Sequence, residues 1–514
     1  MSGPARDRLF VITLLYLLVP NVIFLAGWLR PVWSVPAIAV LAACVVDLLR
    51  EKGPAAPSLT ARQWAFVAAF ALFWTTVAGI GELGPQVTDY LKHNLVFHDL
   101  VVRPWPVVYG ETGPHGALLC YYLAYYLPAS LVGKTLGIAW TAPASFLWGL
   151  SGVALAFAWI ARLARGRGAA VLVVFTLVDG FGWLPGLYPF ARNIGLLPGR
   201  VEGVWWGAGF TEAIASFGVP PIRLLFECVP RQLLWAPQHT IAVWLVTACL
   251  LRTLGEGRPP RQLGLVLASA LLWSPFVVIG ALPFAVMALR GRMRAAAGWP
   301  GVVGGAVIAL PIGLYFLSHA PQQYIGFLPA LFSGGADWLR YAFFLVTSIG
   351  ALAFAVGIAR TRAGAPASAD WRLFVVAAIM LAAATLVYIG RFDDWIMRAS
   401  GPALTVFRLT VARVAVELWS RRGRLAPRLA FAGLVLMSAE RPLKTWALAP
   451  FGRLPGQGCN TTIATATLAA ASVAHLRGDA DWDYAGQYLG SKRSTFARHL
   501  MRRPGLGPAL TAPR

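Results

Sequence analysis

The sequence predicts an all-α polytopic membrane protein with about 11 to 13 transmembrane helices. Of its 514 residues, 58% are hydrophobic and only 13% are charged, whereas a soluble domain has about 45–50% apolar and about 25% charged residues. Apolar runs of about 20 residues, the length that crosses a bilayer, recur along the chain. The basic residues gather between these runs rather than in one stripe. The net charge of +23 therefore indicates loops beside a bilayer and no nucleic-acid partner.

The apolar runs define the predicted membrane segments in order. The first is too long for a cleaved signal peptide and has no small-residue cleavage site. After residue 400 the pattern is weaker, because charged residues interrupt it. The runs lie near residues 9–29, 31–49, 63–82, 116–133, 142–163, 168–184, 236–251, 262–289, 299–317, 338–359, 372–390, 402–418 and 427–447.

Arginine and lysine clusters in short loops predict the orientation, because such clusters face the cytoplasm. They place the N-terminus in the cytoplasm and require that segment 116–133 does not cross. That segment carries four tyrosines, which favour the headgroup interface, so we expect an interfacial helix on the outer surface. The tyrosines are Tyr121, Tyr122, Tyr125 and Tyr126. The basic clusters are Arg6 and Arg8; Arg50, Lys52 and Arg62; Arg162, Arg165 and Arg167; Arg252, Arg258 and Arg261; Arg290, Arg292 and Arg294; Arg360, Arg362 and Arg372; and Arg421, Arg422, Arg424 and Arg428.

Segment 262–289 is too long for one crossing and contains Trp273-Ser274-Pro275. Proline interrupts the hydrogen bonding of a helix. We therefore expect two shorter helices that return to the same side, which keeps Arg290 and its neighbours cytoplasmic.

This topology divides the chain into a transmembrane domain, residues 1–449, and a polar C-terminal tail, residues 450–514, whose side of the membrane is not determined. Two long outer loops, about 83–141 and 185–235, belong to the first part. The five cysteines are far apart and include no CxxC pair, so neither a disulfide framework nor a zinc ribbon is predicted.

The first outer loop has the most pronounced functional pattern. It contains Glu82, Asp89, His93 and Asp99. Asp89 and His93 are four residues apart and share a face in a helix. A carboxylate at the bilayer surface can act as a general base toward a hydroxyl or help to hold a divalent metal, and a neighbouring histidine can orient it. The alternative is an ordinary solvated loop.

Basic residues in and after the second outer loop are candidates for phosphate binding. Arginine has a planar fork of donors that matches phosphate oxygens. The leading candidates are Arg223, Arg231 and His239, the last within the motif WAPQH. The alternative is that arginine is simply the common basic residue of this chain, with 39 Arg against 5 Lys.

A third cluster follows segment 372–390 and contains Asp393, Asp394 and Arg398. Adjacent acidic residues can bind a metal or hold arginines in place, and an ordinary charged helix cap is equally compatible with the pattern. Asp179 lies within an apolar run, where a charge is costly in lipid. It therefore faces either the outer surface or a protein cavity.

This layout resembles the GT-C superfamily of membrane glycosyltransferases, which use polyprenyl-phosphate-linked sugars as donors. The resemblance covers roughly residues 63–290 and rests on the acidic first outer loop, the tyrosine segment within that loop, the basic turn RLARGRG and the broken helices. It implies that Asp89 serves as base or metal ligand, and that Arg223, Arg231 or Arg398 binds the donor phosphate. This chain has two additional helices before the acidic loop and lacks the adjacent acidic pair that is usual there.

Three hypotheses follow. In the first, the protein moves a sugar from a polyprenyl phosphate to an acceptor at the outer face, with Asp89 as base, His93 orienting it and arginines stabilising the departing phosphate. In the second it is a transporter or lipid flippase, which requires charges deep within several helices. In the third it is a non-catalytic membrane partner protein. The abundance of arginine and alanine is typical of GC-rich bacteria, so the expected location is the bacterial inner (plasma) membrane. The expected partner is a lipid-linked sugar donor, and a divalent metal is the cofactor left open.

Overall fold

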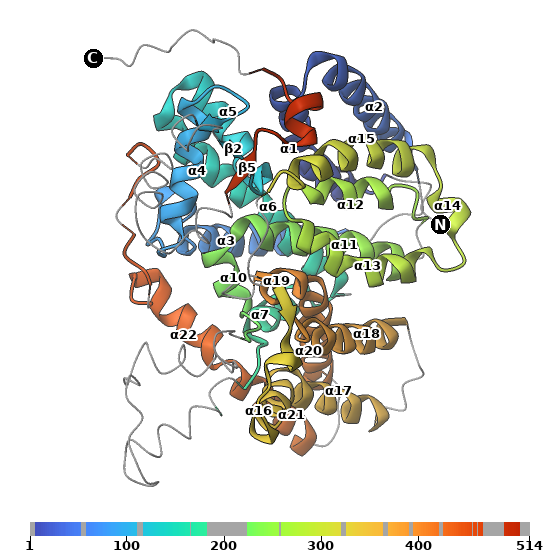
Figure 1. The fold of residues 1–514 in the computed structure, drawn as a ribbon. Coiled ribbons are helices and arrows are strands. Elements are labelled where there is room, and N and C mark those ends of the chain that lie inside the picture. The colour runs from blue at the N-terminus through green and yellow to red at the C-terminus, as the bar shows by residue number, and fades with distance from the viewer. Residues whose placement is uncertain are drawn as a thin grey trace.

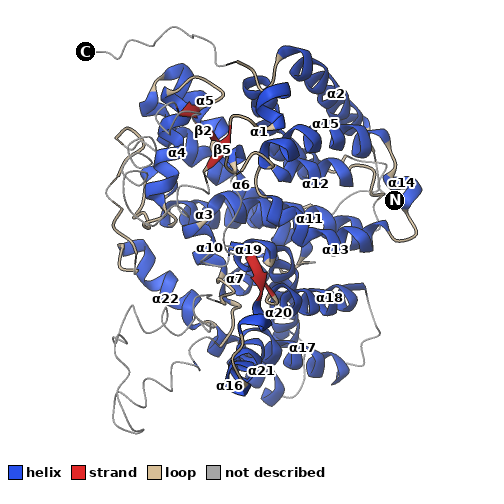
Figure 2. Cartoon of the chain, viewed as in Figure 1, coloured by secondary structure: helices blue, strands red, loops and turns tan. Residues whose placement is uncertain are grey.

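Helices make up nearly all regular structure in the part of the chain that the computed structural model describes (Figures 1 and 2). The fold is all-α, and its strands are only two or three residues long. The described residues are 6–52, 58–109, 117–164, 166–181, 184, 224–255, 259–319, 325–362, 369–389, 394–420, 425–454, 456–459, 461–465 and 488–503.

The helices before residue 181 include the one that begins directly after Asp89. Thr60 begins the third helix with a capping box shared with Gln63, and Pro31 begins the second, where its missing N–H has no partner to lose. These helices are α1 (Arg8–Trp28), α2 (Pro31–Arg50), α3 (Ala61–Val77), α4 (Tyr90–Val102), α5 (Leu127–Leu136), α6 (Thr141–Leu163) and α7 (Gly168–Leu177), with short turns η1 (Ile80–Glu82), η2 (Leu123–Tyr125) and η3 (Ile138–Trp140).

The later helices follow residue 224. They are α10 (Val229–Trp235), α11 (Pro237–Gly255), α12 (Leu263–Leu271), α13 (Pro275–Leu289), α14 (Met293–Ala296), α15 (Trp299–Phe316), α16 (Gly335–Leu345), α17 (Ala351–Arg362), α18 (Ala369–Ala384), α19 (Asp394–Ala399), α20 (Gly401–Ser420), α21 (Leu425–Ser438) and α22 (Glu440–Leu448). The strands are β1 (Val108–Tyr109), β2 (Ala117–Leu119), β3 (Ile325–Phe327), β4 (Val387–Ile389) and β5 (Leu489–Ser491). They form an antiparallel sheet of order β1-β2-β5 and a separate pair β3-β4.

Several helices have the length and composition of membrane spans. They carry exposed apolar side chains such as Val35, Leu310 and Phe354, which suits contact with lipid better than contact with water. The shorter helices α7, α13 and α21 are also apolar. Among the described residues, five helical segments are long and apolar enough to cross a membrane: Arg8–Trp28, Pro31–Arg50, Ile138–Leu163, Trp299–Phe316 and Asp337–Thr361. The membrane character of the chain agrees with the sequence, and the larger predicted number of crossings stays a prediction.

Two of the predicted cytoplasmic clusters meet at one carboxylate. Arg162 Nη1, at the end of α6, and Arg252 Nε, near the end of α11, each lie 2.7 Å from an Asp7 carboxylate oxygen. All three side chains are nearly fully buried, so the ion pairs compensate charges that are costly to remove from water. The start of α1 and the ends of α6 and α11 therefore share one end of the molecule.

The predicted break in segment 262–289 is confirmed. Helix α12 ends at Leu271 and α13 begins at Pro275, with Pro275 at the first helical position. Arg261, before the pair, bonds to Asp47 at the end of α2, and Arg292, after the pair, donates to the Thr253 carbonyl at 3.3 Å. Both ends of the pair therefore lie at the same end of the molecule, as two returning helices require.

The prediction of an interfacial helix over 116–133 is wrong for its first part. Residues 117–119 form β2, and the helix α5 begins only at Leu127. Tyr121, Tyr125 and Tyr126 are buried, so they pack inside the protein rather than lie at a headgroup surface. A tyrosine-rich pattern fits both environments, because the ring is apolar and the hydroxyl can find a partner in either.

Two parts of the chain after residue 450 pack against the helical body. Strand β5 pairs with β2, and the buried side chains of Leu454, Ile463 and Phe496 join the main hydrophobic core. In Figure 1 the last described segment lies beside α1, α2 and α15, far from α22 in the view.

Candidate active site

A cavity of about 450 Å³ lies between α4, α10, α11 and α19. It unites residues from the predicted first outer loop, from the end of the predicted second outer loop and from the third cluster. Asp89 and Arg398, for example, are more than 300 positions apart in sequence. The lining residues are Asp89, Lys92, His93, Tyr121, Leu225, Glu227, Gln232, Trp235, Ala236, Gln238, His239, Thr240, Val243, Asp394, Met397, Arg398, Gly401 and Tyr488. Five predicted site residues therefore face one space: Asp89, His93, His239, Asp394 and Arg398.

Asp89 reaches the cavity from the start of α4. After α3 the chain turns through Gly79 and Gly81, whose φ angles of 72° and 68° fall in the left-handed region that favours glycine. Asp89 is the residue before the first helical residue of α4, and its carboxylate pairs with Lys92 at 3.1 Å. Its side chain retains 33% exposure. A carboxylate that is partly solvated and set in a cavity wall is suited to accept a proton from a bound hydroxyl.

His93 has different partners from those expected. Its Nε2 lies 3.2 Å from the Trp235 carbonyl oxygen, which can only accept, so Nε2 carries the proton. Its Nδ1 lies 2.6 Å from the Tyr126 hydroxyl, which then donates to the ring. Burial lowers the pKa of His93 to about 4, so the ring is neutral. Both nitrogens are thus used in joining α4 to α10 and to η2, and orientation of the Asp89 carboxylate by a His93 hydrogen bond is not part of this geometry.

The first turn of α11 presents polar atoms without partners. Gln238 and His239 are 2% and 3% exposed. Gln238 Oε1 and both ring nitrogens of His239 have no hydrogen-bond partner among the described residues, although an unsatisfied buried polar atom costs about 1–3 kcal/mol. The helix N-terminus also carries a partial positive charge. Helix ends of this kind bind anions such as phosphate, so the arrangement indicates a place for a polar, anionic ligand.

Arg398 supplies a fixed positive charge on the side of the cavity formed by α19. Its Nη2 pairs with Asp394 at 2.9 Å, and its Nη1 donates to the Tyr122 hydroxyl at 3.3 Å. The Tyr122 ring also meets His239 edge-on, with ring centroids 4.7 Å apart. Arg398 and His239 are therefore held on two sides of one tyrosine, and both face the same ligand space.

The remaining predicted residues lie elsewhere or outside the described residues. Glu82 is exposed and accepts from the Ile463 N–H at 2.7 Å. Asp99 is fully buried and accepts from the Tyr109 hydroxyl at 2.9 Å, with His98 at 3.2 Å. Arg231 is buried on α10 but is not among the cavity-lining residues. Arg223 and Asp393 are outside the residues that the structure describes.

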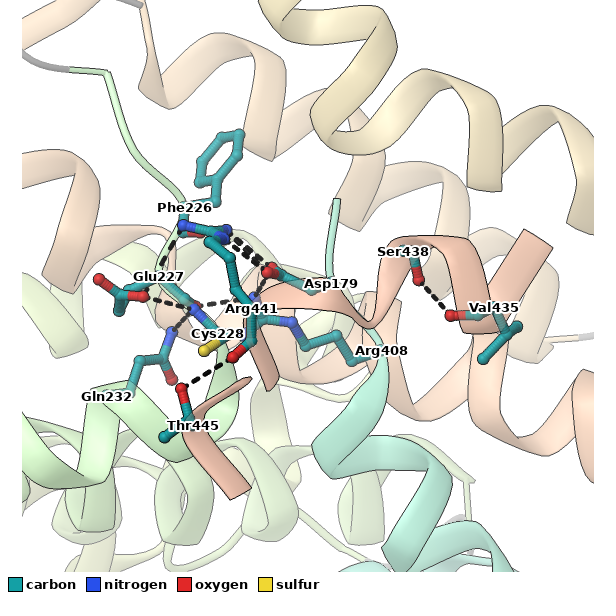
Figure 3. Close-up of polar contacts among 10 residues, drawn as sticks. All are labelled: Asp179, Phe226, Glu227, Cys228, Gln232, Arg408, Val435, Ser438, Arg441 and Thr445. Carbon is teal, nitrogen blue, oxygen red and sulfur yellow. Dashed lines mark hydrogen bonds and ion pairs between the residues drawn. The ribbon is translucent and has the colours of Figure 1, made fainter. Parts of the chain in front are cut away.

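A buried ion-pair cluster supports one wall of the cavity (Figure 3). Asp179, just after α7, pairs with Arg441 of α22 at 2.8 Å and with Arg408 of α20 at 3.2 Å. Arg441 also donates to the Phe226 carbonyl and Arg408 to the Glu227 carbonyl. The cluster therefore fixes the backbone just before α10, from which the Glu227 side chain reaches the cavity. Asp179 faces protein rather than lipid, one of the two environments that its sequence position allowed.

The described cavity does not fit a divalent metal. Its carboxylates already have basic partners: Lys92 for Asp89, Arg398 for Asp394, and Arg441 for Glu227 at 3.8 Å. No group of three or more metal-ligating side chains occurs in the described part of the chain.

Sequence reasoning missed two parts of the cavity wall. Gln238 lies inside the WAPQH motif, but an amide next to proline gives no signal of its own. Tyr488 lies in the segment predicted as a polar tail, and only the pairing of β5 with β2 brings it to the cavity. Tyr121 was placed at the lipid interface and instead faces the same space.

Comparison with known proteins returned no similarity: no family model, no curated protein and no solved structure matches this chain.

Proposed function

We propose that this protein is a GT-C-type membrane glycosyltransferase that moves a sugar from a polyprenyl phosphate to an acceptor at the outer face of the membrane. The observation that carries the proposal is the single cavity that has Asp89 in its wall together with Gln238, His239 and Arg398. Transfer from a phosphate-linked donor needs a carboxylate base and, in the same space, groups that can hold the phosphate. Here those groups are Arg398 and the unpartnered polar atoms of Gln238 and His239.

In the proposed reaction, the acceptor hydroxyl attacks the anomeric carbon of the donor sugar. Its proton passes to the Asp89 carboxylate as the new glycosidic bond forms. The bond between the anomeric carbon and the phosphate oxygen breaks, and the lipid phosphate leaves with the electron pair. Arg398, one N–H of the neutral His239 ring and the N-terminus of α11 stabilise the negative charge that grows on the phosphate. The Gln238 amide oxygen accepts a hydrogen bond from a sugar hydroxyl.

The proposal includes a membrane arrangement with 11 to 13 crossings in a bacterial inner membrane and a cytoplasmic N-terminus. In its support, the Asp7 cluster ties together helix ends whose arginines favour the cytoplasm. Helix α14, which contains Arg294, lies at one edge of the molecule in Figure 1, whereas α4 and α22 lie at the opposite edge. The cavity, which α4 lines, would then open on the outer side.

The substitution Asp89→Asn tests whether Asp89 is the general base. The amide keeps the size of the side chain but cannot take the proton, so sugar transfer should fall at least about 100-fold, the lower range for loss of a general base. Binding of polyprenyl monophosphate should change little. The matched control is Asp370→Asn, because Asp370 has a similar exposure of 28%, pairs with Arg413 at 2.9 Å, and does not line the cavity. Product formation from radiolabelled lipid-linked sugars in proteoliposomes is the measurement.

Full transfer by Asp89→Asn would remove Asp89 from the mechanism. Counterflow of a lipid-linked sugar without any covalent product, in wild type, would instead favour the transporter hypothesis.

A further inference from the structure

The last described segment, residues 488–503, is attached to the first two helices at its far end. Arg30, just before α2, donates from Nε to the Met501 carbonyl at 3.1 Å and from Nη2 to the Arg498 carbonyl at 2.6 Å. Trp33 Nε1 donates to the His499 carbonyl at 3.2 Å. These contacts involve the two helices that precede the acidic loop.

The middle of this segment is anchored by an aromatic side chain. Phe496 is fully buried, and its ring packs against Phe24 of α1 and Tyr315 of α15. Burial of one such ring contributes about 1.5–3 kcal/mol. The segment is therefore held by apolar packing as well as by hydrogen bonds.

The near end of the same segment forms part of the cavity. Strand β5 continues the small sheet through β2, and Gly490 lies so close to Cys120 and to the Ser318 carbonyl that an added Cβ would come within 2.9 and 3.0 Å of their atoms. This close approach sets Tyr488 in the cavity wall, where its ring meets Tyr121 with centroids 4.5 Å apart.

We infer that residues 488–503 form a strap that closes the cavity, that α1 and α2 are its dock, and that Tyr488 contacts the bound lipid-linked substrate. The inference rests on the proposed function for the chemistry of the ligand. The function of the two N-terminal helices, which precede the part of the chain that resembles the GT-C superfamily, is then to hold the segment that forms one wall of the site. Aromatic side chains with a polar end are common in such walls, because they offer a large apolar face and a hydroxyl.

Binding of polyprenyl monophosphate to the full-length protein in lipid nanodiscs tests whether the segment 488–503 forms a wall of the binding site. Tyr488→Ala should weaken binding about tenfold, and Tyr488→Phe should weaken it less, because the ring remains. Arg30→Ala should also weaken binding, although Arg30 does not line the cavity. The matched control is Arg50→Ala, at the other end of α2 and exposed, which should bind as wild type does.

A second readout does not depend on the ligand. Met397 lines the cavity, so Met397→Cys reports access to it by its rate of reaction with a hydrophilic maleimide, after subtraction of the rate of the native cysteines. Adding Arg30→Ala should raise this rate severalfold, and adding Arg50→Ala should not.

The outcomes separate the two proposals. If wild type does not bind the phosphate probe but Arg30→Ala opens position 397, the strap stands and the proposed function fails. If wild type binds, and Tyr488→Ala and Arg30→Ala bind equally well, the strap is overturned and the proposed function stands. An unchanged labelling rate in Arg30→Ala also overturns the strap.

Discussion

His93 shows how a residue with a catalytic signature can serve the framework of a site. Its spacing from Asp89 is correct for a pair on one helix face, yet its two ring nitrogens bond to Tyr126 and to the Trp235 carbonyl. The ring joins the wall that carries Asp89 to the segment that leads into α11. In the proposed reaction its role is therefore one of position.

The low pKa of His93 predicts a pH-dependent contribution to stability. The folded-state pKa is about 4, below the unfolded value of about 6.5. The contribution of the neutral His93 ring to the free energy of unfolding is complete above pH 6.5. It is lost as the pH falls toward 4, because between these pH values the unfolded chain binds a proton at His93 and the folded chain does not. The loss is at most about 1.4 kcal/mol per pH unit. The melting temperature of wild type in detergent should approach that of His93→Gln as the pH is lowered from 7.5 to 4.5. A pH-independent difference between the two proteins would contradict this prediction.

Asp179, just after the end of α7, joins helices α20 and α22 through ion pairs. Asp179 is nearly fully buried and is paired with both Arg408 and Arg441 (Figure 3). Removing one partner of a buried pair leaves an uncompensated charge, which costs more than the pair itself contributes. The cluster should therefore determine how α22 packs.

Arg441→Met should lower the free energy of unfolding by about 3–5 kcal/mol, because Asp179 loses its bidentate partner inside the protein. The double variant Asp179→Asn/Arg441→Met should be less destabilised than the single Arg441→Met variant. Thermal unfolding in detergent measures both. A double variant that is destabilised by the sum of the two single changes would show that the pair is not coupled.

At the scale of elements, the local sequence predicts those structural features that depend on local chemistry. Trp273-Ser274-Pro275 marks a real helix break, at which Pro275 cannot donate the backbone hydrogen bond that would join α12 to α13. The segment with four tyrosines was assigned to the wrong environment. Its backbone conformation depends on pairing between β2 and β5, more than 350 residues apart, and no local pattern records that pairing.

At the scale of the molecule, the cavity and the arginine clusters predict opposite sides of the membrane. Asp89→Cys should react with an impermeant reagent in intact cells, whereas Arg294→Cys should react only after the cells are opened. Labelling each variant before and after permeabilisation is the measurement. If position 89 reacts only in opened cells, the proposed outer site and its lipid-linked donor are both excluded.

The candidate site was only partly predictable at this scale. The sequence indicated Asp89 as a carboxylate at the predicted bilayer surface, and His239 and Arg398 as residues that could bind a phosphate. It could not place them in one space, because that depends on the packing of α4, α11 and α19. It also ranked Arg231 with them, although Arg231 is not among the residues that line the cavity.

The Asp7 carboxylate has a consequence for the order of synthesis. Asp7 precedes its partners Arg162 and Arg252 by 155 and 245 positions, so the two arginines are synthesised at different times. Until Arg252 has been made, the nascent chain can hold only one of the two ion pairs. Helices α1, α6 and α11 can therefore reach their final packing only after α11 is made, and until then Asp7 lacks one of its two partners.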